Sequence, residues 1–83
     1  MSEFNYEQFL CELVKPLVAH PDEVVAKVLS EEDDLITVQV MVNQEDLGRI
    51  IGKKGRVINA IRTIAFATSS KYGKKVDISV DSF

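Results

Sequence analysis

The four residues Gly52-Lys53-Lys54-Gly55 have the types and spacing best suited to chemistry in this sequence. Glycine lets the backbone turn tightly and approach a ligand without a side chain in the way. The two lysines stand at the rim of such a turn, with no acidic residue beside them. Where a turn leads into a helix, the free N–H groups and the helix dipole also favour negative charge. The pattern therefore predicts a turn that binds phosphate.

This turn differs from the phosphate loop of nucleotide hydrolases. Those loops have a longer glycine spacing that ends in Gly-Lys-Ser or Gly-Lys-Thr, whereas here Arg56 follows the second glycine. Isoleucines flank the turn at Ile50, Ile51 and Ile58. We expect some of them to form the floor of a binding groove and others to anchor the turn to the core. For Ile58 the alternative is an ordinary core position on a helix.

Basic residues are concentrated around this turn although the whole chain is acidic. The formal net charge is −3 at pH 7, which argues against general binding of nucleic acid. Residues 48–75 nevertheless contain eight lysines and arginines and no acid, whereas residues 1–47 contain eleven acids and two lysines. We expect one basic face for an anionic partner. The alternative for a basic stretch alone is a solvated helix face.

Length and composition indicate one small globular domain. The chain has 83 residues, of which 46% are hydrophobic, enough for a modest core. No apolar run approaches the roughly 20 residues that span a bilayer, and the acidic N-terminus lacks the basic segment of a secretory signal. The single cysteine, Cys11, cannot form an internal disulfide, which fits a reducing cytoplasm. We expect a cytoplasmic protein.

Hydrophobic periodicity predicts three helices and three strands around the turn. Apolar residues recur at three- and four-residue spacing after Asn5, which can cap a helix start. Alternating and β-branched residues predict the strands. The expected elements are a helix over 5–19, strands over 24–30 and 35–42, a short helix over 44–51, the glycine turn 52–55, a long helix over 55–72 and a strand over 76–81.

The resulting order is α-β-β-α-α-β, an α+β fold. The connection between the last two strands contains both later helices, so strands 35–42 and 76–81 should be parallel neighbours. The strand over 24–30 should pair antiparallel on the other side, giving a three-stranded mixed sheet. We expect all the helices to pack on one face of this sheet and to leave the opposite face comparatively polar.

The run Ile51-Gly52-x-x-Gly55-x-x-Ile58 resembles the signature of the KH domain, whose Gly-x-x-Gly loop clamps about four nucleotides of a single strand. A bare pair of glycines arises in many chains, but the flanking isoleucines, the lysines and the long helix make this match specific. The resemblance extends to Leu47-Gly48-Arg49, Asn59-Ala60-Ile61-Arg62, Val14-Lys15-Pro16-Leu17-Val18 and His20-Pro21. Over essentially its full length the chain is similar to the small bacterial KH proteins of the KhpA type, and its element order resembles that of type II, prokaryotic KH domains.

The resemblance implies that the protein binds single-stranded RNA and is not an enzyme, and that it acts as a post-transcriptional regulator or RNA chaperone. The residues expected at the RNA are Ile50, Ile51, Gly52, Lys53, Lys54, Gly55, Arg56 and Ile58. The motif lacks aromatic stacking platforms, so we expect weak affinity and permissive sequence preference. No pattern indicates a metal, a cofactor or a small-molecule substrate. We interpret His20 as a turn residue and the acidic segment 31–34 as a solvated hairpin turn.

The long helix indicates a second class of function, pairing with another chain. Its apolar residues cover an arc of roughly 180°, whereas a helix packed on one side needs about 100°. The candidate interface is Ala60, Ile61, Ile64 and Ala67. The alternative is that the first helix covers the surplus arc. Proteins of the KhpA type are thought to pair with themselves or with a larger KH-domain partner, and a homodimer or heterodimer would join two weak RNA sites.

Overall fold

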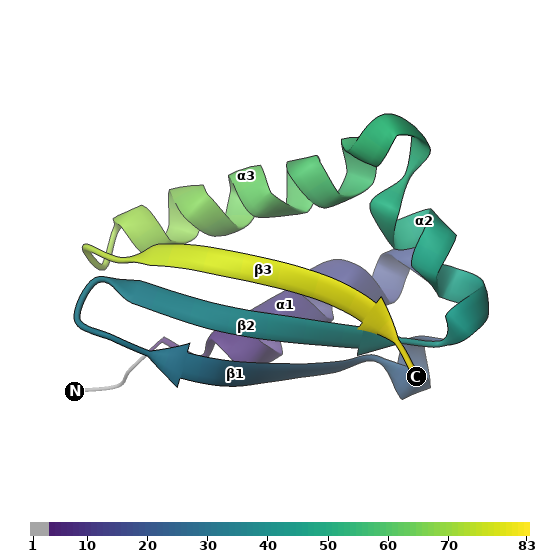
Figure 1. Cartoon of the computed structure of the whole chain (residues 1–83), viewed down its shortest axis with the longest axis horizontal. Coiled ribbons are helices and arrows are strands. Elements are labelled where there is room, and N and C mark those ends of the chain that lie inside the picture. Colours follow the sequence, from purple (N-terminus) through teal and green to yellow (C-terminus); the bar gives the residue numbers. More distant parts are fainter. Residues whose placement is uncertain (1–3) are drawn as a thin grey trace.

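The computed structural model describes residues 4–83 and has the expected element order (Figure 1). Its main elements are α1 (Tyr6–Val14), β1 (Val25–Glu31), β2 (Leu35–Val42), α2 (Leu47–Ile51), α3 (Arg56–Ser70) and β3 (Lys75–Ser82). Short 3-10 turns lie at Lys15–Leu17, Pro21–Glu23, Gln44–Asp46 and Lys53–Gly55. The predicted α+β class is confirmed, and the arrangement is that of a type II KH domain. No helix of the described residues is long and apolar enough to cross a membrane.

The sheet has the strand order β1-β2-β3, with β2 antiparallel to β1 and parallel to β3. Val38 of β2 lies between Val28 of β1 and Ile78 of β3. The register shifts after Val28, so Leu29 has no partner on β2 and its side chain is 55% exposed. Both outer strands are sheet edges, and β3 is the edge that lies beneath α3 (Figure 1).

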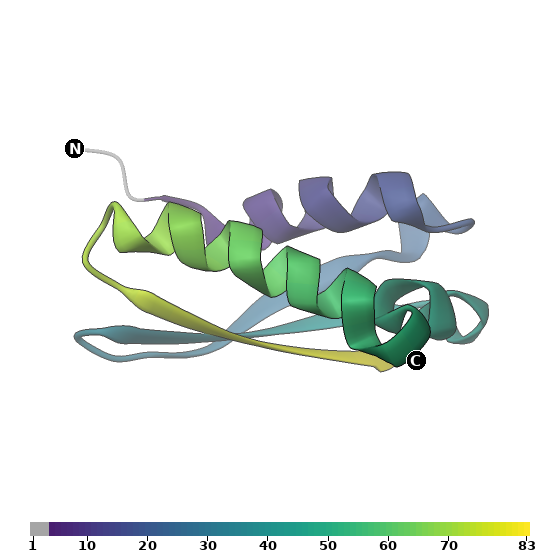
Figure 2. The same ribbon diagram turned by 90° about the horizontal axis from the view of Figure 1, so that it is seen from above.

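The helices all lie on one face of the sheet, as expected (Figure 2). Every second residue of β2 faces the helices and is buried, and these residues are all apolar: Ile36, Val38, Val40 and Val42. The opposite face is comparatively polar, with Lys27, Gln39 and Ser79 side by side across the three strands. The buried apolar core consists of Tyr6, Leu10, Val14, Val24, Ile36, Val38, Val40, Val42, Ile50, Ile58, Ile61, Ala65 and Ile78.

Several element ends differ from the expected ones. The first helix was expected over 5–19, but α1 ends at Val14 and continues as a 3-10 turn, because Pro16 cannot donate a helical hydrogen bond. Its start is as expected, since Oδ1 of Asn5 accepts the N–H of Gln8 at 2.9 Å. The segment 44–51 is divided into a 3-10 turn and the five-residue α2. α3 ends at Ser70 rather than at residue 72, while β1 and β3 extend over 25–31 and 75–82.

Candidate nucleic-acid interface

The glycine turn joins α2 to α3 through backbone conformations that ordinary residues rarely adopt. Gly52, Lys54 and Gly55 have φ values of +75°, +58° and +74°. Two hydrogen bonds close the turn, from the N–H of Gly52 to the oxygen of Gly48 at 2.9 Å and from the N–H of Gly55 to the oxygen of Gly52 at 3.1 Å. Glycine adopts positive φ without steric cost, so the two glycines allow α2 to turn directly into α3.

The two glycines meet different requirements. A Cβ on Gly52 would lie 2.5 Å from Cγ2 and 2.9 Å from the backbone nitrogen of Val57, so the first turn of α3 fills the space that a side chain would need. A Cβ on Gly55 would meet only Nδ2 of Asn59 at 3.7 Å and Cγ2 of Ile58 at 3.9 Å, which are ordinary contacts. Position 52 therefore requires glycine because of both the lack of space and the positive φ, whereas position 55 requires it because of the positive φ alone.

The cations of the turn face solvent. Lys53, Lys54 and Arg56 are all exposed, and none of them forms an ion pair with another described residue. Lys54 is the one non-glycine residue with positive φ among residues 4–83. Such strained conformations concentrate at functional sites. The turn and the first residue of α3 thus present three positive side chains without an ion-pair partner among the described residues, and one of them, Lys54, has a strained backbone conformation.

The start of α3 adds a further positive potential to the same place. α3 begins at Arg56, and no side chain caps its first N–H groups. These groups and the helix dipole favour a bound anion at this end of the helix. The exposed side chain of Arg56 lies in the same first turn. The turn and the helix start together form a surface that suits a phosphate group.

The isoleucines of the motif divide between the surface and the core. Ile51 is 41% exposed at the end of α2 and can contact a ligand. Ile50 is fully buried and Ile58 is 7% exposed, and both belong to the core cluster. The sequence left two roles open for these residues, the floor of a binding groove or an anchor in the core. Ile50 and Ile58 lie in the core, where they anchor the turn. Neither offers a side chain to a ligand on the surface.

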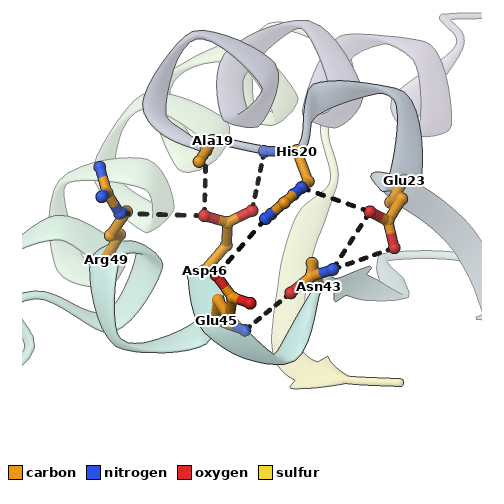
Figure 3. A network of polar contacts seen from close by, with 7 residues as sticks. All are labelled: Ala19, His20, Glu23, Asn43, Glu45, Asp46 and Arg49. Atoms are coloured by element: carbon orange, nitrogen blue, oxygen red, sulfur yellow. Dashed lines mark hydrogen bonds and ion pairs between the residues drawn. The ribbon is translucent and has the colours of Figure 1, made fainter.

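A buried carboxylate fixes the start of α2 against the segment that follows α1 (Figure 3). Asp46 is fully buried. Its two oxygens accept the N–H groups of Ala19 at 2.9 Å and His20 at 3.0 Å, and Nε of Arg49 lies 3.8 Å away. Burial raises the pKa of Asp46, but the two hydrogen bonds and the positive charges of His20 and Arg49 outweigh it and hold the pKa below its ordinary value of 3.8.

His20 lies beside this carboxylate and contacts two further acids (Figure 3). Its Nδ1 is 3.5 Å from Oε2 of Glu23, and its Nε2 is 3.7 Å from Oε2 of Glu45. Nδ2 of Asn43 donates to both oxygens of Glu23 at 3.1 Å, and Oδ1 of Asn43 accepts the N–H of Glu45 at 2.8 Å. The network ties the 3-10 turn before α2 to the turn before β1, and α2 in turn positions the glycine turn.

Sequence reasoning missed two residues that bear on the site. Asp46 resembled an ordinary acid near a helix start, and its hydrogen-bond partners are 26 and 27 residues away. In the sequence Arg62 is one of the basic residues and part of the run that extends the resemblance, and neither fact indicates that its Nη2 donates to the backbone oxygen of Ile78 on β3 at 3.2 Å. The sequence signal that identifies Arg62 is its spacing of seven residues from Gly55, which places both on one side of α3.

The candidate pairing residues on α3 also divide. Ile61 is 4% exposed and is part of the core, so the structure corrects its assignment to an interface. Ala60, Ile64 and Ala67 are exposed, with Ile64 at 46%. The alternative that α1 covers the surplus arc is therefore wrong for these three residues. Phe66, on another side of α3, is 56% exposed.

Comparison with known proteins places this geometry in a family. Residues 7–80 match the family described as KhpA/KhpB, KH domain. A protein named RNA-binding protein KhpA from Listeria monocytogenes is 43% identical over 74 residues, which cover 89% of this chain and 96% of that protein. The protein of the same name from Bacillus subtilis is 38% identical over 81 residues, covering 96% of this chain and 98% of its own length.

A solved structure shows the same fold in a larger protein. The crystal structure of Era from Aquifex aeolicus superimposes with a TM-score of 0.62 at 18% identity, over 98% of this chain and 32% of that one. The match thus concerns about a third of Era and shows the fold alone. The family match and the two bacterial relatives extend over nearly the whole chain, including the glycine turn and α3. The chain belongs to the KhpA/KhpB family of KH domains.

Proposed function

We propose that the protein binds single-stranded RNA and that the glycine turn holds the phosphate backbone of the strand. The observation that carries this proposal is the set of three exposed, unpaired cations on a turn with glycine-dependent conformation at the start of α3. The bacterial relatives are named RNA-binding proteins, which supports RNA as the ligand. The activity is binding, in the role of a post-transcriptional regulator or RNA chaperone in the cytoplasm.

In the proposed complex, phosphates approach the backbone at Gly52 and Gly55, where no side chain stands in the way. Lys53, Lys54 and Arg56 neutralise their charge. Ile51 supplies an exposed apolar contact beside the turn. The strand lies between α2 with its glycine turn and the β3 edge of the sheet. The acidic remainder of the chain opposes nonspecific binding elsewhere.

Salt dependence tests whether phosphates are held. Each neutralised phosphate of a single strand contributes about −0.7 to the slope of log affinity against log salt concentration. With two to four contacts, we expect a slope between roughly −1.5 and −3. The measurement is a fluorescence anisotropy titration of labelled single-stranded RNA at a series of salt concentrations. A slope near zero would contradict phosphate binding, and a much steeper one would contradict a site of this size.

The exposed stripe on α3 supports a second function, pairing with another chain. Ala60, Ile64 and Ala67 form an apolar surface that the rest of the described residues leave open. Alanines permit close approach of a second helix, and the partner we propose is another copy of this chain or a larger KH-domain protein. A pair would hold two weak RNA sites together and raise their combined affinity. Sedimentation at micromolar concentration tests self-association directly.

A further inference from the structure

Two neighbouring cavities lie at the start of α1. The larger, of about 350 Å³, lies between α1 and β1 and is lined by Phe4, Asn5, Tyr6, Glu7, Val28 and Glu31. The smaller, of about 210 Å³, shares the first two of these residues and is lined in addition by Gln8, Phe9 and Glu12. None of the lining residues belongs to the glycine turn or to α3, so the cavities are separate from the proposed RNA site.

Aromatic rings line both cavities. Phe4 lies at the centre of an aromatic cluster. Its ring centroid is 4.8 Å from that of Tyr6 and 5.2 Å from those of Phe9 and Tyr72. Tyr72 follows the end of α3 and is 54% exposed, so the cluster reaches the surface. The face of an aromatic ring attracts a cation.

Carboxylates line the same cavities. Glu7 and Glu31 belong to the larger cavity and Glu12 to the smaller one. None of the three forms an ion pair with another described residue. Oε2 of Glu7 accepts the N–H of Val28 at 2.8 Å, which holds this carboxylate in place at the cavity. The larger cavity therefore combines negative charge with aromatic rings, and this combination suits a cation.

The hydroxyl of Tyr6 is a buried polar group beside the larger cavity. Tyr6 is 7% exposed, and its hydroxyl forms no hydrogen bond with another described residue. Burial, and then the neighbouring Tyr72 and Glu31, raise the pKa of this phenol above its ordinary value of 10.0. Buried polar groups in native proteins are nearly always hydrogen-bonded. This wall of the cavity therefore favours an occupant that brings hydrogen-bonding groups.

We propose that the larger cavity holds the guanidinium group of an arginine in a partner protein. A guanidinium is planar, stays charged, stacks on aromatic rings and donates five N–H groups in a fixed fork. Phe4 supplies a ring, and the carboxylates of Glu7 and Glu31 accept N–H groups. The ammonium group of a lysine matches the carboxylates but does not stack in this way.

The surroundings of the cavity favour a protein over a nucleic acid or a free cation. Phosphates are repelled by the two carboxylates of the larger cavity. Next to Val28, the bulged Leu29 has no partner on β2 and is 55% exposed. Together with the exposed ring of Tyr72, it offers apolar contacts to the chain that carries the arginine. Tyrosine and arginine are both enriched where proteins meet.

The cavity and the glycine turn lie at opposite ends of α3 (Figures 1 and 2). The glycine turn directly precedes α3, whereas Tyr72, whose ring contacts Phe4, follows it. A helix of 15 residues is roughly 22 Å long. A protein that docks at the cavity therefore leaves the glycine turn open, and the chain can hold RNA at one end and a basic protein at the other.

A peptide titration followed by NMR tests the proposal. The full-length protein, labelled with ¹⁵N, is titrated with a capped tripeptide that carries arginine between two glycines. Matched peptides carry lysine, or citrulline, the uncharged isostere of arginine. We expect the arginine peptide to shift the amide signals of residues 5–7, 28 and 31 to saturation, and the other two to bind at least about two- to fivefold more weakly. Equal binding of either matched peptide, or shifts spread over the whole acidic surface, would overturn the proposal.

Variants of the cavity sharpen this test. Glu31→Gln removes one exposed charge and should weaken binding of the arginine peptide by about two- to fivefold. Glu32→Gln makes the same change at the next residue, which does not line the cavity, and should bind as wild type does. Phe4→Leu should weaken binding by about two- to tenfold, whereas Phe83→Leu, at a ring that is 64% exposed at the end of β3, should not. Unchanged affinity in either Glu31→Gln or Phe4→Leu would overturn the proposal.

RNA and self-association give separate outcomes in the same spectra. Single-stranded RNA should move the amide signals of the glycine turn and leave those of the cavity in place. Cavity signals that move with RNA, or with protein concentration alone, would assign the cavity to a nucleic acid or to a second copy of the chain and would contradict the proposal. A protein that binds no RNA but binds the arginine peptide would overturn the proposed function and support this inference.

Discussion

The first turn of α3 occupies the position that a side chain on Gly52 would need, because Cγ2 of Val57 lies 2.5 Å from where the Cβ of residue 52 would stand. The glycine turn and the helix behind it are thus packed as one unit. The φ of +75° and ψ of 171° at Gly52 fall in a region that is open essentially to glycine alone. The shape of the binding turn is fixed by this contact as well as by the flexibility of glycine.

Gly52→Ala should therefore destabilise the fold more than Gly55→Ala does. We expect a loss of about 1 to 2 kcal/mol for Gly55→Ala from the left-handed conformation alone. For Gly52→Ala we expect an additional loss of about 1 to 3 kcal/mol, from overpacking against Val57 and from a backbone conformation that is less favourable for alanine than that of Gly55. Urea unfolding of the two variants measures the difference in the free energy of unfolding. Equal losses would show that the contact with Val57 is relieved at no cost.

A double variant separates the contact from the backbone conformation. Val57→Ala removes Cγ2 but leaves the backbone nitrogen, which would lie 2.9 Å from the new Cβ. Adding Val57→Ala to Gly52→Ala should recover part of the lost stability and no more, since the unfavourable φ remains. In a double-mutant cycle the two changes should be coupled, because residues in contact rarely add independently. Simple additivity of the two losses would contradict the packing account.

The fold should lose stability in acid through Asp46. Because its pKa is lowered in the folded state, the carboxylate stabilises the fold above its ordinary pKa of 3.8, and that contribution is lost as the pH falls through the lower folded-state value. Urea unfolding between pH 7 and pH 2 measures this loss. In Asp46→Asn the amide cannot accept both N–H groups, so the variant should be less stable at pH 7 and should lack this part of the pH dependence.

The matched control for the acid effect is Asp33→Asn in the exposed hairpin turn. It removes a carboxylate for which the structure shows no hydrogen bond with another described residue, and it should unfold as wild type does at every pH. An Asp46→Asn protein with wild-type stability at pH 7 would show that the carboxylate does not fix the start of α2.

The sequence predicted the sheet better than the site, and particular residues show why. In β2 the alternation of Ile36, Val38, Val40 and Val42 is a local pattern, and all four are buried as it requires. Ile50 and Ile51 are adjacent and identical, yet one is fully buried and the other 41% exposed. A helix of five residues has too few positions for periodicity to tell which isoleucine faces the core. Their burial depends on how α2 packs, which a local pattern does not contain.

Hydrogen bonds between segments that are distant in the sequence also cannot be predicted from local sequence patterns. The hydrogen bonds of Asp46 span 26 and 27 residues and that of Arg62 spans 16. An acidic residue before a helix, such as Asp46, is commonly explained by the helix dipole. A basic residue within a helix, such as Arg62, is commonly explained by a solvated helix face. The same is true of the long helix, whose wide apolar arc indicated pairing residues but did not separate the buried Ile61 from the exposed Ala60.

Self-association through α3 should depend on Ala67. We expect wild type to sediment as a dimer at micromolar concentration and Ala67→Glu to sediment as a folded monomer, because a buried, unpaired carboxylate is unfavourable in an apolar interface. Ser79→Glu adds the same charge at an exposed position on the open face of the sheet, away from α3, and is the control. The monomeric variant should also bind RNA more weakly, because its RNA site is no longer linked to a second one.

Two results would contradict this pairing. A wild type that is monomeric, and remains so when a larger KH-domain protein is added, would leave the exposed stripe without a partner. Equal dissociation in Ala67→Glu and Ser79→Glu would show that added charge, rather than the stripe of Ala60, Ile64 and Ala67, controls association.

The most direct test of the central claim is charge reversal in the glycine turn. Lys53→Asp with Lys54→Asp changes two exposed side chains outside the hydrophobic core, and aspartate tolerates the positive φ of residue 54 better than most residues do. Lys27→Glu with Lys75→Glu makes the same change in net charge on the open face of the sheet. In anisotropy titrations with single-stranded RNA, we expect the turn variant to lose affinity on the order of tenfold or more and the sheet variant to keep most of it. A folded turn variant that binds RNA as tightly as wild type would contradict the assignment of the glycine turn as the RNA site.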